Sequence, residues 1–273
     1  MTKQTTDRQF LQSLSRGLVV LEGFTPERSR LTLTEMAQVS GLNLAFLQRC
    51  THTLVSLGYL RKNQRKQYSL GPRVLSLGYS CLQGSELRRL AESQLRAFSQ
   101  RIGFTVNLGV LDGSDVLVLY RHELQRFFKF DVQPGTKLPC YCTSMGKLLL
   151  AALDHESLNQ VLAGVKLQRL TSSTITKRSD LLKQLAKVRD QGFAESDREA
   201  TPALYSIAAP LLNHSDQVVA AINVSVLKGS GGEDIPQNLC NELIEEGRKL
   251  SGLLGYQGDY PRIIVGPPSR GGI

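Results

Sequence analysis

The stretch from residue 32 to residue 58 constrains the fold of this chain more than any other part of the sequence. A helix-turn-helix needs a small residue where its two helices touch and a turn residue that tolerates a positive φ, and Ala37 and Gly41 stand at that spacing. Leu47 and Cys50 follow where they would point back toward the first of these helices. The residues expected to complete this apolar cluster are Met36 and Leu42. We therefore predict a helix-turn-helix near the start of the chain.

The flanking residues extend this motif to a winged helix-turn-helix over residues 1–71. Three leucines at helical spacing predict a first helix over 13–24. Thr32 or Thr34 can cap the second helix, and Asn43 can cap the third. The stripe that the third helix is expected to bury consists of Leu44, Leu47, Cys50, Leu54 and Leu57.

The third helix and the hairpin after it carry the residues expected to meet DNA. Gln, Asn and Arg side chains match the donors and acceptors that adenine and guanine present in the major groove. The residues predicted to contact DNA from the helix-turn-helix are Thr34, Asn43, Ala45, Gln48, Arg49 and His52. Strand-like runs at 59–60 and 67–70 predict a hairpin, the wing, whose basic tip follows phosphates. The cations of this wing are Arg61, Lys62, Arg65 and Lys66.

The net charge of +9 is concentrated at the same end of the chain. Residues 1–80 hold 11 Lys and Arg against 4 Asp and Glu, whereas residues 81–273 hold 22 against 20. A basic module joined to a nearly neutral one is typical of a protein whose first part meets a polyanion. The expected partner is a double-stranded DNA operator. A solvated basic face is the alternative that charge alone leaves open.

The remaining residues predict an α+β fold built on an antiparallel sheet. Residues 72–102 are expected to form linker helices, with a break before Ser85, which can cap the second of them. Residues 103–256 then alternate strands and helices. Strands are expected at 104–111, 116–120, 127–132, 193–196, 205–212 and 218–227, and helices at 143–153, 154–162, 179–191 and 234–254. The Gly- and Pro-rich residues 257–273 are expected to be a disordered tail.

Composition and motifs argue against several other classes of protein. No stretch approaches the roughly 20 apolar residues needed to cross a bilayer, and the first residues lack the apolar region of a signal peptide. The five cysteines are scattered, which predicts a cytoplasmic protein without disulfides. No catalytic, metal-binding or cofactor motif is recognisable, so none is expected. Two alternatives stay open, a thiol enzyme that uses Cys140 or Cys142 and a nonspecific architectural DNA binder.

Several passages together resemble the IclR family of bacterial regulators. They are SLSRGLVVLEGF at 13–24, the helix-turn-helix and wing at 31–60 and 65–80, and the pair LPCYCTSMGKLLLA and GFAESDREATPALYSIAAPLLN. The resemblance is nearest to the branch that regulates aromatic catabolism through the β-ketoadipate pathway, which includes PcaR, PcaU and PobR. It implies a winged-helix domain, a linker helix used in dimerisation and a GAF-like domain that binds small organic acids. The expected assembly is a homodimer, with a tetramer on DNA as the alternative, and the expected function is regulation rather than catalysis.

The effector is expected to bind beside the helix that starts near residue 143. Unpaired N–H groups, hydroxyls and the helix dipole there favour a carboxylate. The residues of this helix start are Thr143, Ser144, Met145 and Gly146. The resemblance adds Ser196, Ser206, Asn223 and Ser225, and many members carry an acidic residue where Ser196 stands and a cysteine where Ser206 stands. A second carboxylate partner is predicted at Arg121, and an aromatic slot from Tyr141, Tyr205 and Phe128. An aromatic acid or a β-ketoadipate-like dicarboxylate is the expected effector, and an ordinary capped helix with core aromatic residues is the alternative.

Overall fold

A computed structural model describes residues 9–124, 132–227 and 235–268 of the chain. The chain divides into two compact units, residues 1–81 and residues 82–273. Among the described helices, none combines the length and the apolar character needed to span a membrane.

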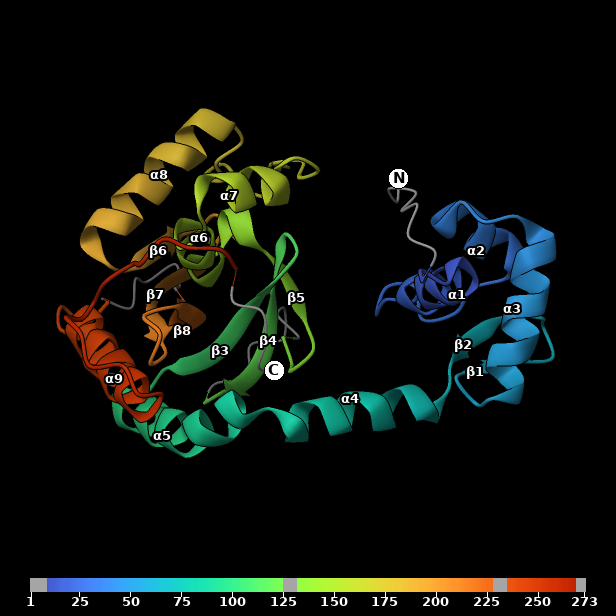
Figure 1. The fold of residues 1–273 in the computed structure, drawn as a ribbon, viewed down its shortest axis with the longest axis horizontal. Helices are drawn as coiled ribbons and strands as arrows, with labels where there is room; N and C mark the ends of the chain where they lie inside the picture. The colour runs from blue at the N-terminus through green and yellow to red at the C-terminus, as the bar shows by residue number, and fades with distance from the viewer. Residues whose placement is uncertain (1–8, 125–131, 228–234, 269–273) are drawn as a thin grey trace. The chain divides into compact units, whose positions relative to one another are not determined.

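The first unit contains the predicted helix-turn-helix and wing (Figure 1). Its elements are α1 (Gln12–Glu22), α2 (Leu33–Ser40), α3 (Leu44–Ser56), β1 (Leu60–Lys62) and β2 (Tyr68–Leu70), followed by the start of α4 (Pro72–Gly84). Thr32, rather than Thr34, caps α2, because its side chain accepts a hydrogen bond from the N–H of Glu35 while the Glu35 carboxylate accepts one from the N–H of Thr32. Gly41 ends α2 with a φ of 69°, as the motif requires.

The buried stripe of α3 differs in part from the prediction. Leu47 is fully buried, and Cys50 and Leu54 pack partly against the same core. Leu44 and Leu57, however, are about half exposed, because they lie at the two ends of the helix where few neighbours cover them. Thr51 is fully buried instead. Its hydroxyl remains satisfied because it donates to the carbonyl of Gln48 at 3.2 Å.

In the second unit, six described strands form one antiparallel sheet in the order β5-β4-β3-β8-β7-β6. The strands are β3 (Thr105–Asp112), β4 (Asp115–His122), β5 (Lys137–Pro139), β6 (Ala194–Asp197), β7 (Leu204–Leu212) and β8 (Val218–Leu227). The predicted hairpin across residues 112–114 is confirmed. The short strand β5 and the 3₁₀ turn Cys140–Cys142 were not predicted. Most of the predicted strand 127–132 lies outside the described residues.

Helices cover both faces of this sheet (Figure 1). On one face, α5 (Glu86–Ile102) and α9 (Leu239–Leu253) pack against alternate residues of the central strands. On the other face lies α6 (Ser144–Ala151), with α7 (His155–Leu162) and α8 (Arg178–Gln191) packed around it. Ser85 caps α5 as predicted. The last helix begins at Leu239, later than the predicted residue 234.

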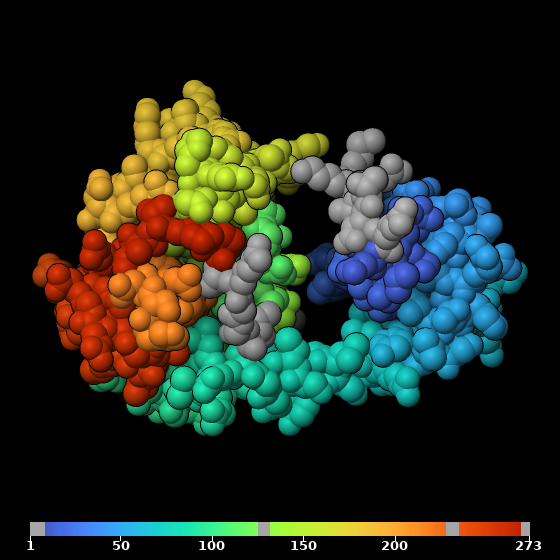
Figure 2. Space-filling model, viewed as in Figure 1, coloured from blue at the N-terminus to red at the C-terminus, as the bar shows by residue number. Residues whose placement is uncertain are grey.

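The segment after α9 is ordered, so the prediction of a disordered tail is wrong for residues 257–268. Tyr260 and Ile263 are buried, and the hydroxyl of Tyr260 donates to the carbonyl of Pro210 at 2.7 Å. Further along, Gly266 forms a parallel bridge with Leu153, which lies just after α6. Figure 2 shows this red segment lying across the surface of the second unit. Its aromatic and branched residues bury apolar area that its Gly and Pro content does not reveal.

Candidate functional site

The outer face of α3 presents the side chains that were predicted to read DNA. Ala45, Gln48, Arg49 and His52 are exposed on this helix, and Thr34 is exposed on the first turn of α2. Asn43 is also exposed, but its Oδ1 accepts a hydrogen bond from the N–H of Phe46 at 2.8 Å and so caps α3. The sequence of α3 contains no acidic residue that would repel phosphate. The helix therefore offers an uninterrupted neutral-to-basic surface of the length that enters a major groove.

The wing carries the four predicted cations in exposed positions. β1 and β2 pair antiparallel with Lys62 opposite Tyr68, and the Lys62 ammonium lies 5.4 Å from the centre of the Tyr68 ring. Lys66 turns the hairpin with a φ of 58°. The remaining cations are Arg61 and Arg65. Four exposed positive charges within six residues suit contacts to the DNA backbone.

In the second unit, the polar residues expected to bind the effector fall on two rows across the sheet. Arg121 on β4, Asn107 on β3 and Asn223 on β8 are direct neighbours in the strand register. Ser225 on β8 lies opposite Thr105 on β3 and Ser206 on β7. Residues that pair across strands share one face, so both rows face α6.

These rows line a cavity of about 220 Å³. Of the predicted effector residues, those that line it are Arg121, Thr143, Met145, Ser206, Asn223 and Ser225. Apolar residues that sequence reasoning missed, Phe104, Leu138, Leu170, Leu204 and Leu227, complete much of the wall. A small cavity with apolar walls and a few converging polar groups is the usual form of a small-molecule site.

A continuous chain of hydrogen bonds runs along the first row. The Arg121 guanidinium donates to Oδ1 of Asn107 at 3.0 Å, and Nδ2 of Asn107 donates to Oδ1 of Asn223 at 2.8 Å. Nδ2 of Asn223 in turn donates weakly to Oγ of Ser144 at the start of α6, at 3.4 Å. Because the side-chain amides of Asn107 and Asn223 are held by these hydrogen bonds, their orientations are fixed before any ligand binds.

Glu123, which the sequence analysis did not select, forms an ion pair with Arg121 at 2.8 Å inside the same cavity. The side chains of Arg121 and Glu123 are only 12% and 22% exposed. Among the described residues that line the cavity, these two are the ones with a formal charge. The sequence signal that could have indicated this ion pair is the spacing of Arg121 and Glu123, two residues apart at the end of a strand. Residues at that spacing in a strand have their side chains on the same face.

The helix start at Thr143 differs from the anion site that was predicted. The hydroxyl of Thr143 caps α6 by accepting a hydrogen bond from the N–H of Gly146 at 3.3 Å, and it donates to the carbonyl of Pro139 at 2.9 Å. Ser144 is fully buried. Gly146 packs so tightly against Cys140 that an added Cβ would overlap the Cys140 backbone. Only Thr143 and Met145 of this turn therefore reach the cavity.

Three other predicted residues do not line the cavity. The hydroxyl of Tyr141 donates to the carbonyl of Gln168 at 3.0 Å, and the hydroxyl of Ser196 donates to the carbonyl of Cys142 at 2.9 Å. Tyr205 faces α9 because it precedes Ser206 on the same strand, and neighbouring strand residues point to opposite faces. Phe128 lies outside the described residues.

A buried ion pair holds the loop that forms one wall of the cavity. The Lys147 ammonium on α6 lies 2.5 Å from Oε1 of Glu199, and the side chains of the two residues are 1% and 9% exposed. The carbonyl of Glu199 also accepts a hydrogen bond from the hydroxyl of Thr174 at 2.7 Å. The next two residues, Ala200 and Thr201, line the cavity. The ion pair thus anchors to α6 the loop that forms this part of the cavity wall.

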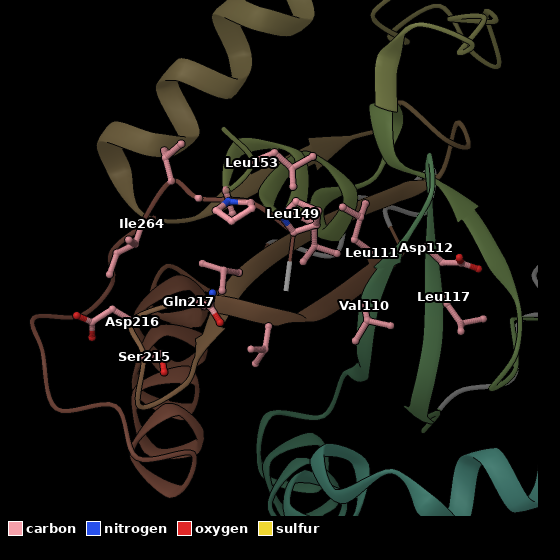
Figure 3. Close-up of a pocket in the computed structure, with 17 residues that line it drawn as sticks. Val110, Leu111, Asp112, Leu117, Leu149, Leu153, Ser215, Asp216, Gln217 and Ile264 are labelled. Carbon is pink, nitrogen blue, oxygen red and sulfur yellow. The ribbon is translucent and has the colours of Figure 1, made fainter. Parts of the chain in front are cut away.

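A second cavity of about 550 Å³ lies at the other end of the same strands (Figure 3). Leu111, Leu149 and Leu153 form its apolar wall, and Asp112 and Asp216 stand at its edge (Figure 3). Its described lining contains no Lys or Arg. This cavity is larger, but its charges repel an organic acid, so charge favours the cavity that contains Arg121.

The two thiols of the Cys140–Cys142 pair are unsuited to nucleophilic catalysis. Both are buried, and burial raises the pKa of Cys142 to about 12 and that of Cys140 well above its usual value. A buried thiol at neutral pH is almost entirely protonated and therefore unreactive. In the described part of the chain, no three His, Cys, Asp or Glu side chains cluster as metal ligands would.

A winged helix-turn-helix with a cationic wing, joined to a unit whose small cavity has apolar walls and a few converging polar groups, defines a DNA-binding regulator controlled by a small effector. Residues 13–64 match the model of the IclR helix-turn-helix domain, and residues 79–252 match that of the bacterial transcriptional regulator IclR C-terminal domain. The chain therefore belongs to the IclR family of transcriptional regulators. Its relatives are regulators and not enzymes.

Individual relatives agree with this assignment. The Pca regulon regulatory protein of Pseudomonas putida is 38% identical over 226 residues, which are 82% of this chain and 77% of that protein. The crystal structure of a transcriptional regulator from Rhodococcus sp. RHA1 is 35% identical, with a TM-score of 0.72 over 90% of this chain and 99% of that one. An IclR homologue from Microbacterium hydrocarbonoxydans, crystallised with 4-hydroxybenzoate, has the same fold with a TM-score of 0.72 at 24% identity, covering 89% of this chain and 99% of that one.

Proposed function

We propose that this regulator binds its operator as a homodimer and responds to a small aromatic acid or dicarboxylate held in the 220 Å³ cavity. The main support for an acidic effector is the position of Arg121. It is a cation at the end of a row of preordered amides, inside a small and largely apolar cavity. The cavity is smaller than the roughly 300–1,000 Å³ typical of sites for drug-sized molecules, which favours a ligand of about one ring. 4-Hydroxybenzoate is the first acid to test, because one homologue was crystallised with it and another relative is the Pca regulon regulatory protein.

The effector proposal is tested by filling each cavity in turn. Ser225→Leu places an apolar side chain in the cavity that contains Arg121, whereas Ser215→Leu places the same side chain at the larger cavity. We expect calorimetry with 4-hydroxybenzoate to show binding to the wild type and to Ser215→Leu, and little or none to Ser225→Leu. The opposite pattern would assign the effector to the larger cavity. No binding of any aromatic acid or dicarboxylate to the wild type would refute the proposed effector class.

The proposed base contacts are Gln48 and Arg49, with phosphate contacts from the wing. Because a lost bidentate base contact costs about 1–3 kcal/mol, Gln48→Ala or Arg49→Ala should weaken operator binding by that amount and leave binding to random DNA nearly unchanged. The operator is first selected from a random library, and gel shifts then compare the variants with Gln160→Ala, a control on the exposed face of α7. Equal losses of affinity for the operator and for random DNA would assign these residues to phosphate contacts. If the wild type binds all sequences with the same affinity, the protein is instead a nonspecific architectural DNA binder.

The proposed dimer rests on apolar surface in the first unit that is exposed among the described residues. Exposed large apolar side chains on and beside α1 are Phe10, Leu11, Leu14 and Leu18, and those on α4 are Leu75, Leu77 and Tyr79. A surface of this kind marks a protein interface more often than a free face. Leu14→Glu should therefore lower the mass measured by light scattering and weaken operator binding together. A wild-type monomer with full operator affinity would refute the dimer.

A further inference from the structure

The guanidinium of Arg121 is paired over only part of its donor surface. One terminal nitrogen, Nη1, donates to Asn107, and the other, Nη2, donates to Oε1 of Glu123 at 2.8 Å. Nε is buried and has no hydrogen-bond partner in the described part of the chain. Nε and Nη2 lie on the same edge of a guanidinium, where a carboxylate can accept one hydrogen bond from each. Glu123 thus takes half of a two-donor site.

A better-placed carboxylate would gain the second donor of this edge, Nε. A buried N–H group without a partner has a free-energy cost, and a carboxylate that bound Nε and Nη2 together would remove it. Glu123 follows β4 by a single residue and is tethered to the same short stretch of chain as Arg121, which it contacts through one oxygen. A free acid in the cavity has no such tether and can approach the edge in the plane of the guanidinium.

We propose that Glu123 is an internal competitor for the effector carboxylate and determines the specificity of the cavity for acids. In the absence of effector, Glu123 neutralises Arg121 and lowers the cost of holding a cation in a mostly apolar cavity. The effector carboxylate then takes the Nε–Nη2 edge and displaces the Glu123 carboxylate toward solvent. A neutral ligand cannot displace Glu123 without leaving Arg121 uncompensated, so it binds weakly. This inference rests on the proposed function, because it assumes an acid in this cavity.

The test removes the negative charge of Glu123 and retains its shape. Calorimetry measures 4-hydroxybenzoate and its neutral amide, 4-hydroxybenzamide, on the wild type, on Glu123→Gln and on Glu156→Gln, which removes an exposed carboxylate on α7 outside the cavity. We expect Glu123→Gln to bind the acid roughly tenfold more tightly than the wild type does, with a smaller gain for the amide. We expect Glu156→Gln to match the wild type.

The outcomes separate this inference from the proposed function. If the wild type binds the acid and Glu123→Gln binds it no more tightly, or if Glu156→Gln gains as much, the competition is refuted while the effector class stands. If only Glu123→Gln binds the acid, the competition is supported and the effector class proposed for the natural protein is wrong. If neither binds it, the Arg121 edge does not take a carboxylate even when vacated, and both proposals are refuted.

Discussion

Replacing Lys147 with methionine should destabilise the second unit strongly. The substitution keeps the length and most of the apolar stem of the side chain but removes the ammonium that lies 2.5 Å from Glu199. Glu199 would then be a buried carboxylate without its cation, and its Oε2 already has no hydrogen-bond partner in the described structure. Breaking one side of a buried ion pair costs about 3–5 kcal/mol, because the remaining charge stays desolvated.

The magnitude translates into a large thermal shift. For a unit of roughly 150–250 residues, each kcal/mol lowers Tm by about 2–4 °C, so Lys147→Met should lower Tm by roughly 6–20 °C. Because Ala200 and Thr201 follow Glu199 along the cavity wall, effector affinity should also fall at temperatures where the unit is still folded. Thermal unfolding of the full chain by circular dichroism or calorimetry measures the first effect, and titration of 4-hydroxybenzoate measures the second.

The double variant Lys147→Met/Glu199→Gln separates the ion pair from simple loss of packing. With no charge left in the site, most of the lost stability should return, since replacing both members of a buried pair is often close to neutral. The reasoning is refuted if Lys147→Met lies within about 1 kcal/mol of the wild type, or if the double variant is no more stable than the single one.

Three further outcomes are expected. Arg61→Ala should weaken binding to operator and to random DNA alike, and it should reduce the slope of log affinity against log salt by about one. Fluorescence anisotropy across a salt series measures both effects, and an unchanged slope would show that Arg61 does not contact phosphate. Gly146→Ala should lower Tm because its Cβ meets the Cys140 backbone, whereas Gly164→Ala, with open space around it, should be nearly neutral. Cys140 and Cys142 should resist a thiol reagent at pH 8 until the protein unfolds, because burial keeps the pKa values of both thiols high. Mass spectrometry measures the labelling, and rapid labelling of either thiol in the native protein would contradict their burial.

The sequence by itself determined the elements whose causes are local. The capping residues Asn43 and Ser85, and the turn at Gly41, could be identified because each acts within a few positions of its own place in the chain, and the cap of α2 could be narrowed to Thr32 or Thr34. The strand-and-turn pattern predicted most strands of the sheet for the same reason. Strand periodicity also held information that the prediction did not use, since Tyr205 and Ser206 are adjacent and cannot face the same cavity.

Only the tertiary structure decided which distant residues meet. Asn107 contacts Asn223, and Lys147 contacts Glu199, through strand register and helix packing that no local pattern encodes. The segment 257–268 has the composition of a disordered tail, yet it is ordered because the rest of the fold offers surfaces for Tyr260 and Ile263 to bury. In the same way, the hydrogen bond from Arg121 to Asn107 depends on the register of β4 against β3, whereas the ion pair of Arg121 with Glu123 is local to the end of β4. Contacts between residues far apart in the chain depend on the assembled core, so their geometry follows from packing rather than from sequence pattern.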